Sequence, residues 1–123
     1  MRIFLTKWFA RWAANEGLPE RALVAAVSEM EEGLIDARLG GHIVKKRIAL
    51  SGRGKSGGAR TILAFRFKDK AFFLYGFAKN QADNISDKEL RALKATAAHL
   101  LAYDRHALDK AIAASELIEV KNE

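Results

Sequence analysis

The segment 43–78, which reads IVKKRIALSGRGKSGGARTILAFRFKDKAFFLYGFA, decides the fold of this 123-residue chain. Three runs within it, 43–50, 59–67 and 71–78, are rich in β-branched and aromatic residues, a composition typical of strands. The short interval between the last two runs predicts a tight hairpin, and the glycine-rich loop between the first two predicts another. We therefore expect three consecutive antiparallel strands.

The turns fix the expected pairing of these strands. A turn centred on Asp69 and Lys70 places Arg60 opposite Lys79, and the preceding loop places Arg60 opposite Ala49 on its other side. Because side chains alternate along a strand, one face of the sheet is then apolar. The other face collects cations and aromatic residues, namely Lys45, Arg47, Arg60, Arg66, Phe73, Tyr75, Phe77 and Lys79.

The predicted positions of Lys46 and Arg60 differ. Lys46 falls on the apolar face, and we expect it at an edge of the sheet, where a lysine side chain can extend to water. Arg60 falls on the opposite face, and we expect it on an exposed rim. Its removal would then change the stability of the fold very little.

Helical spacing precedes and follows the strands. Aromatic residues at every fourth position over 4–12 indicate a helix whose stripe packs in the core, and Pro19 suits the first turn of a second helix. A capping box at 86–89 begins a third helix, and Asp104 begins a fourth. The run 117–120 predicts a short edge strand.

These elements predict one α+β domain over residues 1–123. We expect a small antiparallel β-sheet with helices packed on one face, followed by a C-terminal helical extension. The chain has no internal repeat and no linker that would divide it.

The composition narrows the function classes. A net charge of +6 favours an acidic or nucleic-acid partner. The absence of cysteine excludes disulfides and thiolate ligands and fits a reducing cytoplasm. The N-terminus makes a poor signal peptide, and no apolar run approaches membrane-spanning length, so no membrane partner is expected. His42, His99 and His106 are scattered, and we expect neither a metal site nor a cofactor.

The basic segment favours chemistry on a phosphodiester. Gly54-Lys55-Ser56 is no Walker loop, because Ala49 stands where that motif needs glycine and a strand follows. RNA carries its own nucleophile, a 2′-hydroxyl that attacks the adjacent phosphate once a base takes its proton and cations stabilise the new charge. Crowding by like charges would lower the pKa of such a base lysine. Simple phosphate binding by the same cations stays open here. The cations concerned are Lys45, Arg47, Lys55, Arg60 and Lys79.

The same residues resemble the RelE/ParE superfamily of bacterial toxins, and in particular its RelE/HigB-like branch. The resemblance is carried in order by Gly40-Gly41, Lys45-x-Arg47, the segment ending Gly57-Gly58-Ala59-Arg60, and Phe77-Ala78-Lys79-Asn80. It implies a toxin of a type II toxin–antitoxin system that cleaves mRNA on the ribosome by the 2′-hydroxyl route, without metal. It also implies a cognate antitoxin, often with a helix-turn-helix domain, and operator DNA reached only through that antitoxin.

Position by position, the resemblance assigns roles to the cations. Lys45 and Arg47 match the strand cations that contact substrate, and Arg60 matches the arginine beside the scissile phosphate. Lys79 matches the cation after the last central strand, and Lys55 matches a loop lysine that takes the proton or binds phosphate. Further candidates for RNA contact are Arg53, Arg66, Tyr75 and Phe77.

The chain also departs from that pattern. Members of the family carry a tyrosine near Ile85 or Ser86 and often another at the position of Phe77, and this chain has neither. The general base is therefore not assigned. Two alternatives stay open at this stage, a ParE-like inhibitor of DNA gyrase and a non-catalytic nucleic-acid-binding module.

Overall fold

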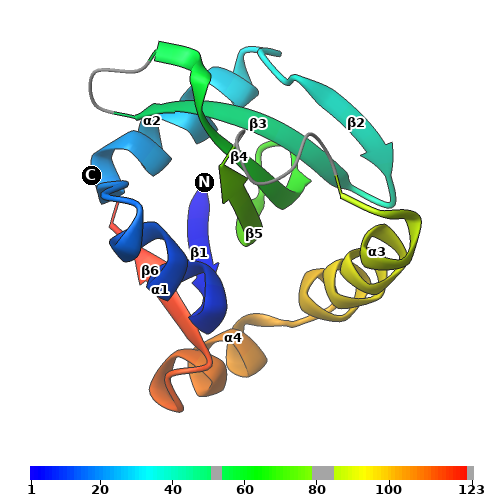
Figure 1. Ribbon diagram of the computed structural model, residues 1–123. Helices are drawn as coiled ribbons and strands as arrows, with labels where there is room; N and C mark the ends of the chain where they lie inside the picture. Colours follow the sequence, from blue (N-terminus) through cyan, green and yellow to red (C-terminus); the bar gives the residue numbers. More distant parts are fainter. Residues whose placement is uncertain (51–53, 79–84, 122–123) are drawn as a thin grey trace.

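A computed structural model of the chain describes residues 1–50, 54–78 and 85–121, with 54–57 described by backbone alone (Figure 1). Six strands form one sheet in the order β2-β3-β4-β5-β1-β6. The elements are β1 (Arg2–Thr6), α1 (Lys7–Asn15), α2 (Glu20–Glu31), β2 (Ala37–Gly40), β3 (Ile43–Leu50), β4 (Gly54–Arg66), β5 (Lys70–Ala78), α3 (Asp87–Leu101), α4 (Arg105–Ala113) and β6 (Leu117–Val120).

The sheet is mostly antiparallel. Strands β2 to β5 pair in succession as antiparallel neighbours, β1 pairs with β5 in parallel, and β6 pairs with β1 antiparallel. The expected α+β class, the small sheet and the C-terminal helices are confirmed. Strand β1 was not predicted, because its apolar residue Phe4 continues the aromatic spacing of α1. The helix begins only after Thr6, whose side-chain oxygen accepts a hydrogen bond from the Phe9 N–H at 3.1 Å.

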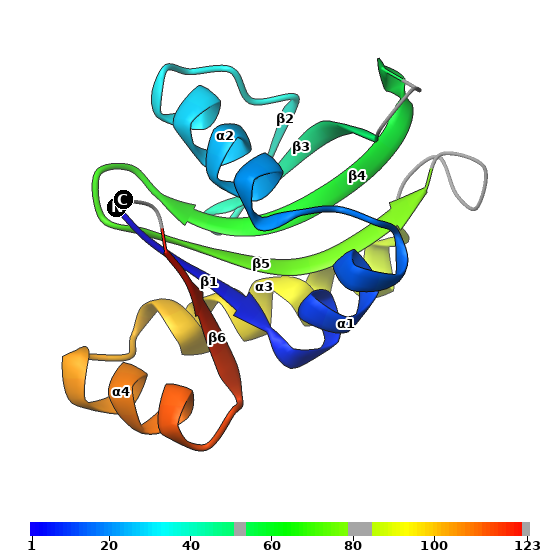
Figure 2. The same cartoon turned by 90° about the vertical axis from the view of Figure 1, so that its left-hand side faces the viewer.

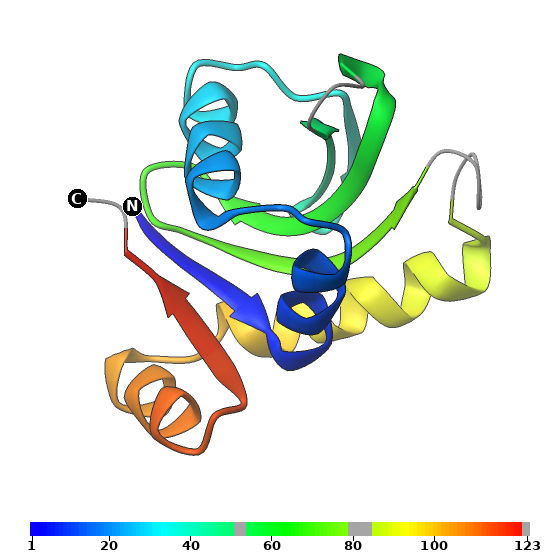
Figure 3. The same cartoon turned by 60° about the vertical axis from the view of Figure 1, so that its left-hand side comes forward.

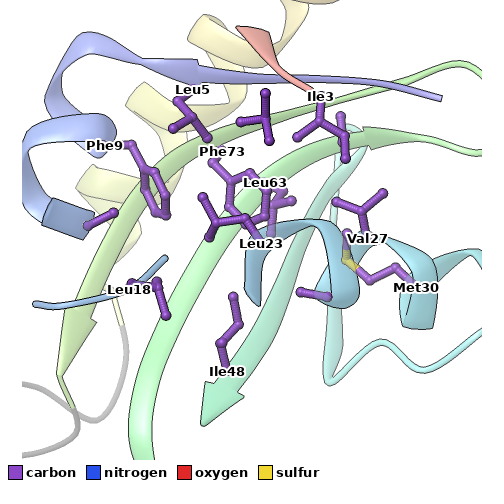
Figure 4. Close-up of a cluster of buried hydrophobic side chains, with 14 of the residues drawn as sticks. Ile3, Leu5, Phe9, Leu18, Leu23, Val27, Met30, Ile48, Leu63 and Phe73 are labelled. Atoms are coloured by element: carbon purple, nitrogen blue, oxygen red, sulfur yellow. The ribbon is translucent and has the colours of Figure 1, made fainter. Parts of the chain in front are cut away.

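Helices cover both faces of the sheet, not one as expected. Figure 2 shows α2 and α3 on opposite sides of the strands. Residues of α1 and α2 pack with Leu63 and Phe73 on one face (Figure 4), and residues of α3 and α4 pack with Ile62 and Phe72 on the other. The reason is that β5 from 71 to 78 and β4 from 62 to 65 carry apolar residues at successive positions, and such segments must be buried on both sides.

Around Arg60 the strand pairing differs from the prediction by two residues, and from Leu63 onward the pairing of β4 with β5 differs by three. Arg60 lies opposite Phe77 on β5 and opposite Arg47 on β3. The turn between β4 and β5 holds three residues, with Lys68 in the left-handed conformation at φ 60°. An even shift leaves each side chain on its predicted face. An irregularity between Phe73 and Tyr75 is the exception, since it turns Phe73 to the face covered by α1 and α2.

Lys46 is buried inside the sheet, so its predicted edge position is wrong. Strand β3 lies between β2 and β4, and only 4% of the Lys46 side chain is exposed. Its ammonium group forms an ion pair with Glu29 of α2 at 2.7 Å and donates a hydrogen bond to the Leu34 carbonyl at 2.8 Å. A buried charge is tolerated here because it is paired and hydrogen-bonded.

Helix α1 covers the part of β5 that extends beyond the end of β1 (Figure 3). The ring of Trp12 lies directly over Gly76, so a Cβ there would overlap the ring. We expect Gly76→Ala to lower the free energy of unfolding by about 1–2 kcal/mol through overpacking, as measured by urea denaturation. In a Trp12→Ala background the same change should cost much less, and an equal cost in both backgrounds would contradict this account.

The two ends of the sequence are joined by an ion pair. Arg2 donates hydrogen bonds to both carboxylate oxygens of Glu119, at 2.8 and 3.0 Å, and so ties β1 to β6. These hydrogen bonds from Arg2 lower the pKa of Glu119. A carboxyl group with a lowered folded-state pKa contributes stability above its ordinary pKa of about 4, and this contribution is lost as the pH falls through the folded value.

We therefore expect the urea midpoint to fall between about pH 5 and pH 3. In Arg2→Ala this fall should be shallower, since Glu119 would then titrate alike in both states. Parallel pH profiles for the wild type and Arg2→Ala would show that the pair does not contribute.

Candidate nucleic-acid interface

Two adjacent rows of cross-strand neighbours bring cations and aromatic residues together. Arg47, Arg60 and Phe77 lie side by side on β3, β4 and β5, and the next row holds Lys45 and Tyr75 with Ile62 between them. Directly paired residues point to the same side of a sheet. We name Lys45, Arg47, Arg60, Tyr75 and Phe77 the basic–aromatic face; it is the side on which α3 packs.

Arg47 is the accessible cation of this face. Its Nε donates to Asp36 at 3.0 Å and its backbone N–H donates to the same carboxylate at 2.7 Å, while 43% of its side chain is exposed. Burial alone would raise the pKa of Asp36, but the hydrogen bonds and charge of Arg47 outweigh it and the pKa is lowered. Asp36 therefore stays ionised and holds Arg47 in one orientation, with Lys45 half-buried beside it.

Arg60 lies deeper than expected. Only 9% of the residue is exposed, and its Nη1 donates a hydrogen bond to the Gly58 carbonyl at 3.4 Å. The prediction of an exposed rim is wrong, because Arg47 and Phe77 flank Arg60 on the neighbouring strands. Arg47 and Arg60 are cross-strand neighbours of like charge, so an anion that contacts both would be favoured.

Arg66 lies on the same strand but far from this cluster. It is six residues from Arg60 along β4, about 20 Å at the rise of a strand. It pairs with Asp69 at 3.3 Å and donates to the carbonyl of Leu101 at the end of α3. The structure therefore does not bring Arg66 to the other candidate cations.

Three predicted residues cannot be placed as side chains. Arg53 and Lys79 lie outside the described residues, and Lys55 belongs to the part of β4 that is described by its backbone. Ile85 and Ser86, where the resemblance leads one to expect a tyrosine, have structural roles here. Ile85 packs among the apolar residues under α3, and Ser86 caps that helix by accepting from the Glu89 N–H at 3.1 Å.

Tyr75 is held in a fixed position. Its ring stacks on Trp8 at a centroid distance of 4.8 Å and lies 6.2 Å from the ring of Phe77. Burial raises the pKa of Tyr75, and the charge of Glu89 and a hydrogen bond to that carboxylate raise it further. The phenol therefore loses its proton less readily than a free tyrosine.

Trp8 is an aromatic residue of this region that the sequence did not mark as functional. It was assigned to the core stripe over 4–12, yet 46% of it is exposed. Its partner in that stripe, Trp12, is the one that packs against the core. The spacing was a correct signal for a helix, but it could not tell which aromatic residue faces inward.

The fold and the site define a class: a small α+β protein with a basic–aromatic surface on a mostly antiparallel sheet. A family model described as RelE toxin of the RelE / RelB toxin-antitoxin system matches residues 1–120. The chain belongs to this family and is the toxin of a toxin–antitoxin pair. A search of curated proteins gave no match. Within the described residues, no helix combines the length and apolar character needed to cross a membrane.

Proposed function

We propose that this toxin is a metal-independent endoribonuclease that cleaves mRNA on the ribosome. The observation that carries the proposal is the convergence of Lys45, Arg47 and Arg60, from two strands, beside the rings of Tyr75 and Phe77. Cations next to aromatic rings suit a single-stranded RNA, whose phosphates need charge and whose bases need a stacking surface. Family membership supports the same activity, and the cognate antitoxin is the expected inhibitor.

The proposed reaction uses the substrate's own nucleophile. The 2′-oxygen forms a bond to phosphorus, the bond from phosphorus to the 5′-oxygen breaks, and the products are a 2′,3′-cyclic phosphate and a 5′-hydroxyl end. A base takes the 2′ proton, and the leaving oxygen gains a proton. The negative charge that develops on the phosphate is where Arg60 and Arg47 would act, since guanidinium groups bind two phosphate oxygens at once.

The other residues take supporting roles. Lys45 would hold a neighbouring phosphate, and Tyr75 and Phe77 would contact bases. The raised pKa of Tyr75 makes it a poorer base than a free tyrosine. Lys55 and Lys79 remain the candidates for proton abstraction, with Arg53 as a further phosphate contact. The limited exposure of Arg60 adds one requirement: its guanidinium must become accessible when RNA binds.

The test uses ribosomes programmed with an mRNA whose A-site codon carries either ribose or 2′-deoxyribose at the position of cleavage. We expect the purified toxin to cut the ribose substrate, to leave a 2′,3′-cyclic phosphate, and to leave the deoxyribose substrate intact. Cleavage of both substrates would contradict the 2′-hydroxyl route. Intact mRNA together with inhibited supercoiling by DNA gyrase would indicate a ParE-like toxin, and binding without either effect would indicate a non-catalytic module.

A further inference from the structure

Trp8 is half-exposed where the basic–aromatic face meets α1. With 46% of the residue exposed, it is among the most exposed large apolar side chains of the described residues. Its ring stacks on Tyr75 with an interplanar angle of 24°, and it lies nearly parallel to Trp12, at 9° and 6.3 Å. Tryptophan and tyrosine are enriched at binding surfaces because they combine a large apolar ring with a polar N–H or O–H, so the exposed area of the Trp8–Tyr75 pair is a candidate ligand contact.

The ring of Trp8 is held from several sides before any ligand arrives. Thr6 caps the first turn of α1, in which Trp8 lies, and Trp12, one turn further along, is wedged over Gly76. Tyr75, on which Trp8 stacks, packs against the apolar cluster under α3 and lies 6.2 Å from the ring of Phe77. A rigid aromatic surface loses little conformational entropy on binding.

Two cations of α1 lie near Trp8, while the carboxylate of Glu89 lies near Tyr75. Lys7 and Arg11 are both exposed on α1, and Arg11 lies three residues after Trp8, next to it on the helix surface. The first turn of α1 contains no acidic residue. A lysine at a helix N-terminus opposes the helix dipole, so this end of α1 favours an anion.

Trp8 also continues the row of residues that begins at the proposed reaction centre. Arg60 lies opposite Phe77, whose ring is followed by Tyr75 and then by Trp8. A nucleotide stacked on Trp8 would therefore lie a short stretch of chain away from a phosphate held at Arg60. Its own phosphate would be within reach of the cations on α1.

We propose that Trp8, supported by Tyr75, is a base-stacking platform that holds an unpaired base of the RNA beside the cleavage site. This inference rests on the proposed function and adds a residue that positions the substrate. A π-face suits any base, so the platform supplies affinity without a strong sequence preference. The cations beside it favour a nucleic acid over an apolar segment of a protein partner.

Tryptophan fluorescence can show directly whether RNA contacts Trp8, because the chain contains two tryptophans. Trp12→Phe leaves Trp8 as the only tryptophan, and we expect its fluorescence to be quenched by a single-stranded 2′-O-methyl oligoribonucleotide, which cannot be cleaved. Trp8→Phe leaves Trp12, whose fluorescence should change little. The quenching curve of the first variant should give the same Kd as fluorescence anisotropy of a labelled oligonucleotide.

Affinity provides the second readout. Trp8→Ala should bind the oligonucleotide about tenfold more weakly than the wild type. Trp8→Phe keeps a stacking ring, and we expect its Kd to rise by less than about threefold. The matched control is Phe67→Ala, which removes a more exposed aromatic residue from the turn between β4 and β5 and should leave the Kd unchanged. Urea denaturation of each variant identifies any loss caused by unfolding.

The outcomes separate the platform from the proposed function. Wild-type binding with an unchanged Kd in Trp8→Ala would overturn the platform and leave the nuclease standing. Weaker binding of the antitoxin alone would also overturn it, and would make Trp8 a protein contact. A wild-type chain that cleaves no mRNA and binds no oligonucleotide would overturn both.

Discussion

Arg60→Ala should lower the rate of ribosome-dependent mRNA cleavage by at least about a hundredfold. A factor of one hundred corresponds to about 2.7 kcal/mol of lost transition-state stabilisation. The loss is expected to be large because a guanidinium group in a mostly buried setting interacts strongly with the charge that develops on the phosphate. The measurement is a single-turnover cleavage rate on programmed ribosomes at saturating toxin.

Arg66→Ala is the matched control for this prediction. It removes the same residue type from the same strand, about 20 Å away, where Arg66 is engaged by Asp69 and the end of α3. We expect its cleavage rate to stay within about threefold of the wild type. Equal losses in the two variants would mean that net charge, and not the position of Arg60, accounts for activity.

Arg60→Lys separates the geometry of the guanidinium from its charge. A lysine keeps the positive charge but cannot bind two phosphate oxygens side by side. We expect an intermediate rate, at least about tenfold below the wild type. The urea midpoint should be measured for both Arg60 variants, because the buried position makes some loss of stability expected, in contrast to the expectation drawn from the sequence.

The sequence predicted which residues share the basic–aromatic face better than it predicted the pairing of the strands. At Arg60 both strand registers were wrong by two residues, and because an even error preserves the face, Arg60 and Tyr75 were correctly placed on one face. From Leu63 onward the register between β4 and β5 was wrong by three residues, which is why Phe73 lies on the other face. The error came from backbone features that composition does not reveal: the left-handed Lys68 in the turn and the irregularity near Leu74. Those features depend on tertiary packing.

The second helical layer was missed for a related reason. When a strand has few polar residues, its sequence does not show whether it is buried on one face or on both. Phe72 and Phe73 are adjacent and both fully buried, which is possible only when helices cover both sides of β5. Trp8 was predicted to lie in the core and is instead half-exposed. Periodicity identifies a helix, but it does not give the rotation of that helix against the sheet.

Glu29→Ala should lower the free energy of unfolding by about 3 kcal/mol. The change leaves the ammonium group of Lys46 with the Leu34 carbonyl but without its carboxylate, at a position where 4% of the side chain is exposed. Breaking a buried ion pair by removing one partner costs about 3–5 kcal/mol. The low end applies because 36% of the Glu29 side chain is exposed, so water can partly replace the carboxylate.

Lys46→Met tests whether the stranded charge, and not lost packing, causes that cost. Methionine has a similar length and no charge, so it fills the space between Val44 and Ile48 and leaves a carboxylate that water can reach. We expect Lys46→Met to stay within about 1 kcal/mol of the wild type, and the double variant with Glu29→Ala to be more stable than Glu29→Ala alone. Chemical denaturation of the wild type, the two single variants and the double variant gives a double-mutant cycle for the pair. Additive losses would mean that the two side chains stabilise the fold independently, and the ion pair between α2 and β3 would then not explain why a lysine lies inside the sheet.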